Sequence, residues 1–152
     1  MQLQWQRLDG RDGHTAGRQL LAQMVDPMPQ ILIDPRGKPY FATGDLHFSI
    51  SHTKNHVFCA ISHKNIGIDA EECARNVSPN LAKKVLSPSE FALWQDYHNP
   101  DEALLRLWVL KESYAKLTGR GLGEYLYHTN FDPADPRIQV IDGCLVAVME
   151  EE

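Results

Sequence analysis

Two carboxylates in the segment IGIDAE, residues 66–71, are spaced for metal binding. Asp69 and Glu71 stand two positions apart. In a β-strand, residues two apart project from the same face, so both carboxylates would leave one face while Ile66 and Ile68 anchor the other in the core. Two neighbouring carboxylates repel each other unless a positive charge lies between them, and Mg²⁺ prefers oxygen ligands of this kind. The pattern therefore indicates a divalent-cation site, with a solvated strand edge as the alternative.

A third carboxylate falls on a predicted helix within LWVLKESYAKLTGRGLG, residues 107–123. Glu112 and Lys116 are four positions apart and so share one side of the helix, with Trp108 one turn earlier. Lys111 adds a second cation next to Glu112. An ammonium group beside a carboxylate-bound metal suits a phosphate or diphosphate substrate, whereas a solvated ion pair on the helix surface is the alternative.

Two further segments contribute polar groups. SISHT, residues 49–53, brings Ser51 and His52 to the end of a predicted strand, and RGKP, residues 36–39, offers a glycine turn with two cations. Each has an ordinary structural explanation, a hydrogen-bonding histidine in the first case and a solvated turn in the second. Each signal is weak alone, and the combination indicates function.

Hydrophobic periodicity and turn residues predict an α+β fold. Helices are expected over 14–25, from a capping box at Ser87 toward His98, and over 102–118 with Gly119 after the last turn. Strands are expected over 30–34, 46–51, 57–62 and 66–71, the last three as an antiparallel meander, and in a hairpin over 137–148 that turns at Asp142 and Gly143. This order suggests one compact domain, 1–152, of two similar halves at about 1–64 and 65–152. Each half would be an antiparallel sheet of about three strands packed with helices.

The composition indicates a globular domain and excludes several classes of protein. The chain has 152 residues, of which 43% are hydrophobic and 23% charged, and no apolar run approaches the length of a membrane span. Because the N-terminus also lacks the apolar segment of a signal peptide, we expect a soluble cytoplasmic protein that does not bind a membrane. The net charge of −5 argues against a broad nucleic-acid-binding surface but leaves room for one basic pocket.

The cysteine pattern bears on the choice of metal. Cys59, Cys73 and Cys144 are odd in number, widely spaced and not part of a CxxC motif. Neither a disulfide framework nor a zinc site is therefore expected, and buried free thiols are the expected state. The three carboxylates have no histidine or cysteine set beside them in the sequence, so Mg²⁺ or Mn²⁺ is the expected ion.

In order along the chain, GKP, SISH, GIDAE and WVLKESYAKLTGRGL resemble the signature of the 4′-phosphopantetheinyl transferases. The resemblance runs from about Gly37 to Gly123 and includes spacing as well as residue types. The small AcpS-type members carry the GID motif almost at the N-terminus, whereas here it begins at Gly67, so the chain resembles a short Sfp-type member. That resemblance implies a pseudo-dimer of two α+β halves with the active site at their seam, complete in one chain, and hence a monomer.

The resemblance also implies a role for each of the residues singled out above. Asp69, Glu71 and Glu112 would hold Mg²⁺, for which Mn²⁺ could substitute. Asp69, Glu112 and Lys116 would be catalytic, with Glu112 as the base that takes the proton of the attacking hydroxyl, directly or through a metal-bound water. Coenzyme A would be the co-substrate, bound by Arg36, Gly37, Lys38, Pro39, Ser51, His52, Lys111 and Lys116.

The implied reaction moves 4′-phosphopantetheine from coenzyme A to a serine hydroxyl of an apo acyl or peptidyl carrier protein and releases adenosine 3′,5′-bisphosphate. The carrier could belong to fatty-acid, polyketide or nonribosomal-peptide synthesis. Two alternatives remain open: a non-catalytic relative that binds coenzyme A or a carrier protein, and a different Mg²⁺-dependent phosphate enzyme. The second lacks the support of a P-loop.

The sequence departs from the Sfp-type pattern near its N-terminus. The basic stretch that grips the 3′-phosphate of coenzyme A in larger members is largely missing, and Arg11, His14 or Arg18 could substitute for it. For the carrier protein, the expected docking patch has the cations Arg75, Lys83 and Lys84 and the apolar residues Val77, Leu81, Val85 and Leu86. Lys83 and Lys84 could equally form the solvated face of a short helix.

Overall fold

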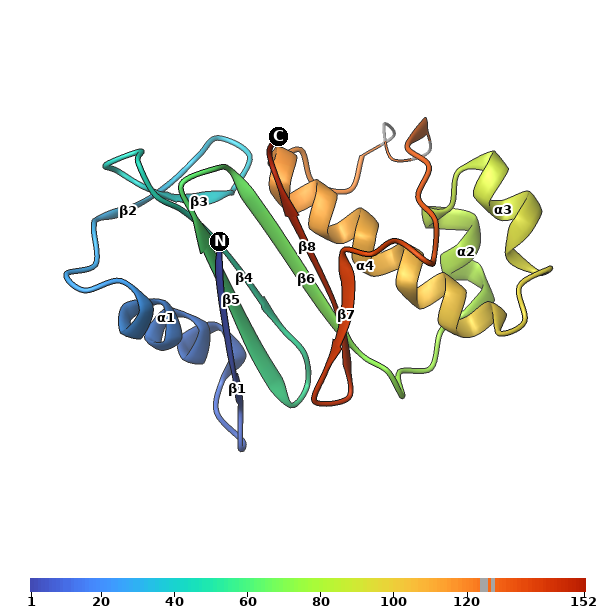
Figure 1. Cartoon of the computed structure of the whole chain (residues 1–152), viewed down its shortest axis with the longest axis horizontal. Helices are drawn as coiled ribbons and strands as arrows, with labels where there is room; N and C mark the ends of the chain where they lie inside the picture. The colour runs from blue at the N-terminus through green and yellow to red at the C-terminus, as the bar shows by residue number, and fades with distance from the viewer. Residues whose placement is uncertain (124–125, 127) are drawn as a thin grey trace.

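Two three-stranded antiparallel sheets form the centre of the molecule, and helices lie on their outer sides (Figure 1). The computed structural model describes residues 1–123, 126 and 128–152. The first sheet has the order β1 (Gln2–Arg7), β5 (His56–Ser62), β4 (His47–His52), and the second has the order β6 (Ile66–Glu72), β8 (Cys144–Glu150), β7 (Ile138–Ile141). A small sheet pairs β2 (Ile31–Ile33) with β3 (Pro39–Phe41). The helices are α1 (Gly13–Met24), α2 (Pro79–Val85), α3 (Pro88–Trp94) and α4 (Pro100–Thr118).

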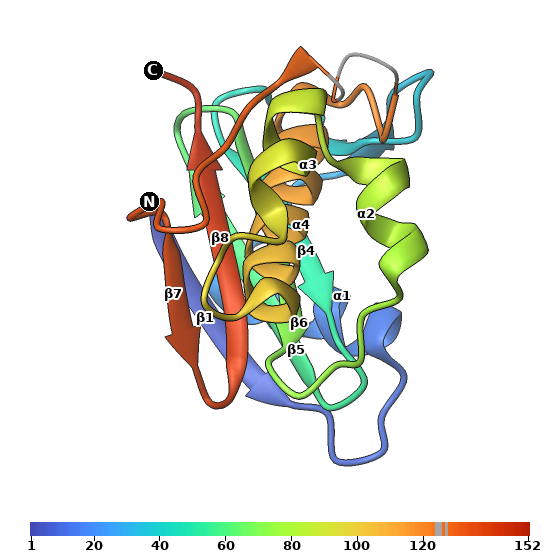
Figure 2. The ribbon, with the colours of Figure 1, turned by 90° about the vertical axis from the view of Figure 1, so that its right-hand side faces the viewer.

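The core has layers that follow the alternation of the strands. On β5, Val57 and Cys59 pack toward α1, whereas Phe58 and Ala60 face the second sheet. The second sheet also packs on both faces. Val146 of β8 lies in the core between the two sheets, and its neighbours Leu145 and Ala147 pack on α4. Helices α2 and α3 cover the outer side of α4, as Figure 2 shows. The fold is therefore α+β, as predicted, with antiparallel sheets packed against helices.

Both sheets repeat one topology. In each, an edge strand is followed by a helix and then by a hairpin whose second strand occupies the centre of the sheet: β1, α1, β4 and β5 in the first, and β6, α4, β7 and β8 in the second. This repetition supports the expected pseudo-dimer, and the division into halves at 1–64 and 65–152 stays a prediction. The predicted meander is wrong in one respect, because β4 pairs with β5 but β6 pairs with β8. Sequential strands pair often but not always, and here the long-range pairing along all of β6 prevails.

The seam between the sheets is held by serine hydroxyls and by a glycine. Ser49 and Ser51 on β4 accept hydrogen bonds from the backbone N–H groups of Ile68 and Ala70 on β6, at 3.0 and 3.1 Å. At Gly67, α4 lies directly on the strand. A Cβ atom there would stand 2.1 Å from the backbone oxygen of Ser113, so only glycine permits this approach.

Local signals set most element ends as predicted. Ser87 and Glu90 form the capping box of α3, and Gly119, at φ 69°, ends α4 in the left-handed conformation. Asp142 and Gly143 both have positive φ, as a type I′ hairpin turn requires. Strands β1 and β3 were not predicted, and the short helix that was an alternative at Lys83 and Lys84 is present as α2. Helix α4 begins at Pro100, two residues before the predicted start, and Cys73 is exposed although the cysteines were expected to be buried. Within the described residues, no helix is both long enough and apolar enough to cross a bilayer.

Candidate active site

A stripe on α4 faces the carboxylates of β6. The indole Nε1 of Trp108 donates to Glu71 Oε1 at 3.0 Å, and Lys116 Nζ lies 3.0 Å from Asp69 Oδ1. Glu112 stands on the helix midway between these two contacts, one turn from each. Trp108, Glu112 and Lys116 thus form one stripe along α4 that faces Glu71 and Asp69, and the three predicted metal-binding carboxylates lie along this contact as one row.

Asp69 is the most enclosed of the three carboxylates, with 7% of its surface exposed. Its Oδ1 accepts hydrogen bonds from Ser51 Oγ at 3.1 Å and from Lys116, whereas its buried Oδ2 has no hydrogen-bond partner among the described residues. Burial raises the pKa of Asp69, although Lys116 opposes that change. A buried carboxylate oxygen without a donor is costly in a closed core and fits a ligand atom for a cation.

Glu112 and Glu71 complete the row in different environments. Burial, and after it the charge of Asp69, raises the pKa of half-buried Glu112 to about 7. Glu71 Oε1 accepts from Arg75 at 2.6 Å as well as from Trp108. Among the described residues, the three carboxylates do not bring their oxygens within 4.8 Å of one another. The donor set fits a hard divalent cation in its chemistry, since all its ligands are carboxylates and one oxygen is unpartnered.

A cavity of about 340 Å³ opens beside this row, at the junction of α1, β4, α4 and the β2–β3 turn. Its size is within the range of small-molecule sites. The predicted residues that line it are Arg36, Gly37, Lys38, Pro39, His52, Glu112 and Lys116. The structure adds lining residues that were not among the predicted site residues, for example Phe48, Ser49 and Ile50. Among the described residues that line the cavity, one is acidic, Glu112, and six are basic, namely His14, Arg18, Arg36, Lys38, His52 and Lys116. In a protein of net charge −5, this concentration of basic groups suits an anionic ligand.

Two of the predicted cofactor-binding residues have their polar groups engaged within the protein. Lys38 lines the cavity with its chain, but its ammonium donates to Asn65 Oδ1 at 2.6 Å and to the carbonyl of Leu117 at 2.9 Å. Burial lowers the pKa of Lys38, against the charge of Asp34. Ser51 lies 5% exposed between β4 and β6, where its hydroxyl donates to Asp69. These groups fasten the turn and orient the carboxylate, and they do not reach into the cavity.

Lys111 does not reach the cavity at all. Its side chain is fully buried on the far side of α4, where Nζ pairs with Glu90 Oε1 at 2.6 Å and donates to the carbonyls of Leu126 and Thr129. The expectation that Lys111 binds coenzyme A is therefore corrected. Neighbours on a helix are turned about 100° from each other, so the face of Glu112 cannot also be the face of Lys111.

The structure also selects among the basic residues near the N-terminus. His14 and Arg18 on α1 line the cavity, and the Arg18 guanidinium lies 5.8 Å from the ring centre of Phe48. Arg11 instead donates to the carbonyls of Leu8 and Arg7, which closes the loop between β1 and α1. Of the three candidates for holding a phosphate, His14 and Arg18 are in position.

The expected docking surface is smaller than the sequence suggested. Lys83 and Lys84 are exposed on α2, whereas Val85 and Leu86 are buried in the core beneath α2 and α3. The apolar residues of this segment are therefore committed to packing. The two lysines remain as candidate contacts of a partner, and they are also the solvated face of a short helix.

The fold and the site define an α+β protein with a carboxylate row and a basic cavity at the junction of two sheets. The chain belongs to the 4′-phosphopantetheinyl transferase superfamily, whose family model matches residues 65–143. It is 41% identical over 90 residues to a 4′-phosphopantetheinyl transferase of Bacillus subtilis, covering 57% of this chain and 39% of that protein. It is 38% identical over 80 residues to the transferase Sfp of Bacillus subtilis, covering 51% and 35%, and 35% identical over 128 residues to HetI of Nostoc, covering 72% and 53%. The chain thus spans about half the length, or less, of these relatives.

Proposed function

We propose that the protein transfers 4′-phosphopantetheine from coenzyme A to a serine hydroxyl of an apo acyl or peptidyl carrier protein and releases adenosine 3′,5′-bisphosphate. The observation that carries this proposal is the cavity beside the carboxylate row, where the charged lining residues of the described chain are basic apart from Glu112. Coenzyme A carries a diphosphate and a 3′-phosphate, which are the anions such a lining suits. The relatives named 4′-phosphopantetheinyl transferase support the same reaction.

The basic residues divide the ligand between them. Lys116 pairs with Asp69 at the carboxylate row and, with His52 from the cavity lining, would meet the diphosphate. Arg36 and the turn at Gly37, which line the same cavity, would lie along the nucleotide end, and Arg18 from α1 would take a further phosphate. Arg18 and Arg36 each suit a phosphate because a guanidinium can donate two parallel hydrogen bonds.

The carboxylates carry the chemical step. Asp69, Glu71 and Glu112 would hold Mg²⁺, or Mn²⁺ in its place, which neutralises charge on the diphosphate when bound. Glu112 accepts the proton of the carrier serine as its oxygen attacks phosphorus, which contributes about 10²–10⁴-fold to the rate. Lys116 meets the negative charge that develops on the departing phosphate. Ser51 holds Asp69 in orientation through its hydroxyl.

The test is direct transfer. The protein is incubated with coenzyme A, Mg²⁺ and an apo carrier protein, and the carrier is weighed by mass spectrometry. We expect one phosphopantetheine per carrier, dependent on Mg²⁺, with Glu112→Gln reducing the rate by at least about 100-fold. The matched control is Glu102→Gln, an exposed position on the same helix that pairs with Arg106. Its rate should equal that of the wild type.

The other possible outcomes of this experiment distinguish the alternative functions. Coenzyme A that binds in equilibrium dialysis without any transfer to a panel of carriers would mark a non-catalytic binding relative. Unchanged transfer in excess chelator would refute the metal-binding role of the carboxylate row. Release of phosphate from a nucleotide, with no carrier modified, would indicate a different phosphate enzyme.

A further inference from the structure

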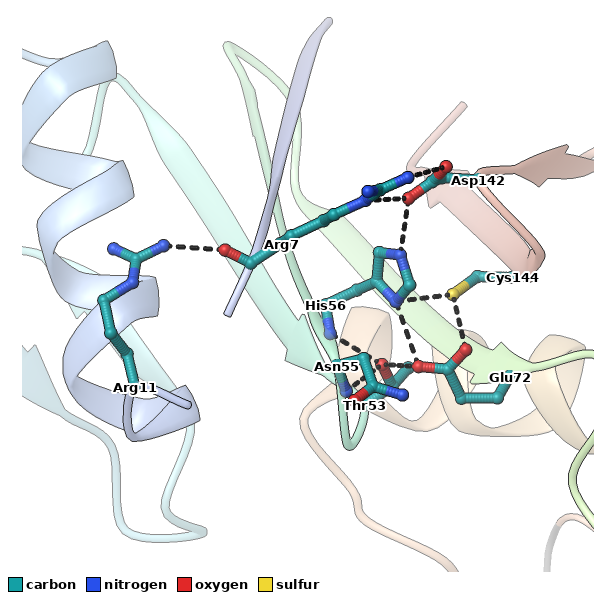
Figure 3. Close-up of polar contacts among 8 residues, drawn as sticks. All are labelled: Arg7, Arg11, Thr53, Asn55, His56, Glu72, Asp142 and Cys144. Carbon is teal, nitrogen blue, oxygen red and sulfur yellow. Dashed lines mark hydrogen bonds and ion pairs between the residues drawn. The ribbon is translucent and has the colours of Figure 1, made fainter. Parts of the chain in front are cut away.

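A second group of ligand-type side chains lies outside the cavity, where three strands of the two sheets end. His56 begins β5, Glu72 ends β6 and Cys144 begins β8 (Figure 3). His56 Nδ1 lies 3.0 Å from Glu72 Oε1, Cys144 Sγ lies 3.4 Å from His56 Nδ1, and Sγ lies 3.5 Å from Glu72 Oε2. A nitrogen, an oxygen and a sulfur atom therefore point at one small volume.

The position of the group follows from strand alternation. On β5 the residues that face the second sheet are His56, Phe58 and Ala60, and on β8 Cys144 and Val146 belong to the same core. His56, Glu72 and Cys144 are thus the last members of three rows that are otherwise apolar. Three polar residues at the end of one core are a departure from ordinary packing, in which hydrophobic residues would continue the rows.

Neighbouring residues orient two members of the group. His56 Nε2 lies 2.8 Å from Asp142 Oδ2, and Arg7 fixes that carboxylate with bonds of 2.8 and 3.0 Å. Thr53 Oγ1 donates to Glu72 Oε1 at 2.6 Å. A carboxylate on one ring nitrogen holds the proton there and leaves the other nitrogen as a lone-pair donor, which is the arrangement around metal-binding histidines.

We propose that His56 Nδ1, a carboxylate oxygen of Glu72 and Cys144 Sγ form a zinc site that joins the two sheets. Around a tetrahedral Zn²⁺ with bonds of about 2.0–2.3 Å, neighbouring ligand atoms lie about 3.3–3.7 Å apart. The three measured separations, 3.0, 3.4 and 3.5 Å, are close to the edges of that polyhedron. The mixed N, O and S donors select Zn²⁺ over Mg²⁺, because Mg²⁺ binds neither thiolates nor imidazoles well.

The group is reached from solvent at Glu72. Thr53 and Glu72 line a surface cavity of about 730 Å³, which gives an ion a path to the ligands and leaves room for a water as the fourth ligand. Glu72 points away from the face of β6 that carries Asp69 and Glu71, so the zinc site and the carboxylate row do not compete for side chains. No zinc site was expected from the cysteine spacing, because spacing along the chain does not show which residues three separate strands bring together.

Binding is coupled to loss of a proton. Burial, and after it Glu72, raises the pKa of the Cys144 thiol to about 12. Coordination therefore requires that the ion displace the thiol proton to solvent, together with the Nδ1 proton of His56 where the ring is charged, and zinc affinity should rise with pH. Burial disfavours the thiolate because it removes water from the charge, and a bound cation compensates for that loss.

The experiment uses the full chain, stripped with chelator and returned to buffer with excess Mg²⁺ to saturate the carboxylate row. Zn²⁺ is titrated by calorimetry, and metal content is measured by mass spectrometry. We expect one Zn²⁺ per chain and a rise in Tm of about 5–10 °C when Zn²⁺ is a hundredfold above its Kd. Co²⁺ used in place of Zn²⁺ should give the near-ultraviolet absorption of a cobalt–thiolate bond.

Variants identify the ligands. Cys144→Ala should weaken binding at least about 100-fold and remove the cobalt–thiolate absorption, and Asp142→Asn should weaken it about 10–100-fold while the absorption stays. The matched control is Cys73→Ser, which removes the exposed thiol next to Glu72 and should change neither. Equal binding by wild type and Cys144→Ala, or no binding of Zn²⁺ by either, would overturn the proposal and leave the group a hydrogen-bonded network. Because the readouts are metal content and Tm, the outcome does not depend on the transfer reaction.

Discussion

Replacing Gly67 by alanine tests how closely α4 must lie on β6 for the carboxylate row to exist. The new Cβ would stand 2.1 Å from the backbone oxygen of Ser113 and 2.5 Å from the backbone nitrogen of Leu117, whereas ordinary contact begins near 3.4 Å. Since both obstacles are backbone atoms, α4 itself must move outward by about 1 Å. Overpacking of this kind costs about 1–3 kcal/mol, and stretching the 2.8 Å hydrogen bond from Ser113 Oγ to the carbonyl of Gly67 adds about 1 kcal/mol.

The same movement separates Glu112 and Lys116 from Asp69. A displacement of 1 Å in a catalytic constellation can cost about 100-fold in rate, so kcat for transfer should fall by that order in Gly67→Ala while the protein remains folded. Urea unfolding followed by tryptophan fluorescence, to which Trp108 on α4 contributes, measures the free energy of unfolding.

The matched control for this substitution is Gly17→Ala on α1. Its Cβ would meet a side-chain atom, Ile50 Cγ2 at 2.7 Å, and a side chain can give way more easily than a helix backbone. The free energy of unfolding of the control should therefore fall by less than that of Gly67→Ala. If Gly67→Ala changed the free energy of unfolding by less than about 0.5 kcal/mol and kcat by less than about twofold, the direct approach of α4 to β6 would be refuted.

Two further predictions concern His56 and the lysines of α2. Burial opposes the charge on His56, but hydrogen bonds with Glu72 and Asp142 outweigh it and raise its pKa above 6.5. In metal-free buffer the charged ring therefore contributes stability that is fully present below about pH 6 and lost as pH rises through its folded-state pKa. The stability of the wild type relative to His56→Gln, from urea midpoints, should fall between about pH 6 and 8, and a rise would contradict the reasoning. Reversing Lys83 and Lys84 to glutamate should raise the KM for carrier protein at low salt and leave the KM for coenzyme A unchanged, and if neither constant moved, the lysines would be ordinary surface.

The part of the site that depends on local periodicity could be predicted from the sequence. Asp69 and Glu71 share a strand face, and Glu112 and Lys116 share a helix face, because these spacings fix direction within one element. The turn at Gly37, with φ 93°, and the end of α4 at Gly119 follow from residue chemistry in the same way. Such features need no knowledge of the partner element.

The remaining features of the fold and the site depend on which helices and strands pack against each other, which the sequence does not show locally. The pairing of β6 with β8 joins residues far apart in the chain, and no local signal distinguishes it from pairing with β5. The motifs also did not indicate that Ser51 and Lys38 turn their polar groups toward other strands and helices, because a motif gives residue types and not partners. The burial of Lys111, in contrast, could have been predicted from its position one residue away from Glu112 on a helix.

Strand β6 connects the two sites proposed for this protein. Asp69 and Glu71 point to α4 and Glu72 points to the core between the sheets, because successive side chains of a strand alternate. A shift of register by one residue would exchange these sets and place two carboxylates in the apolar core, at a cost of several kcal/mol. The apolar rows and the serine bonds at the seam therefore fix the register and the direction of every carboxylate on β6. The geometry of the candidate active site is in this sense a consequence of the core behind it.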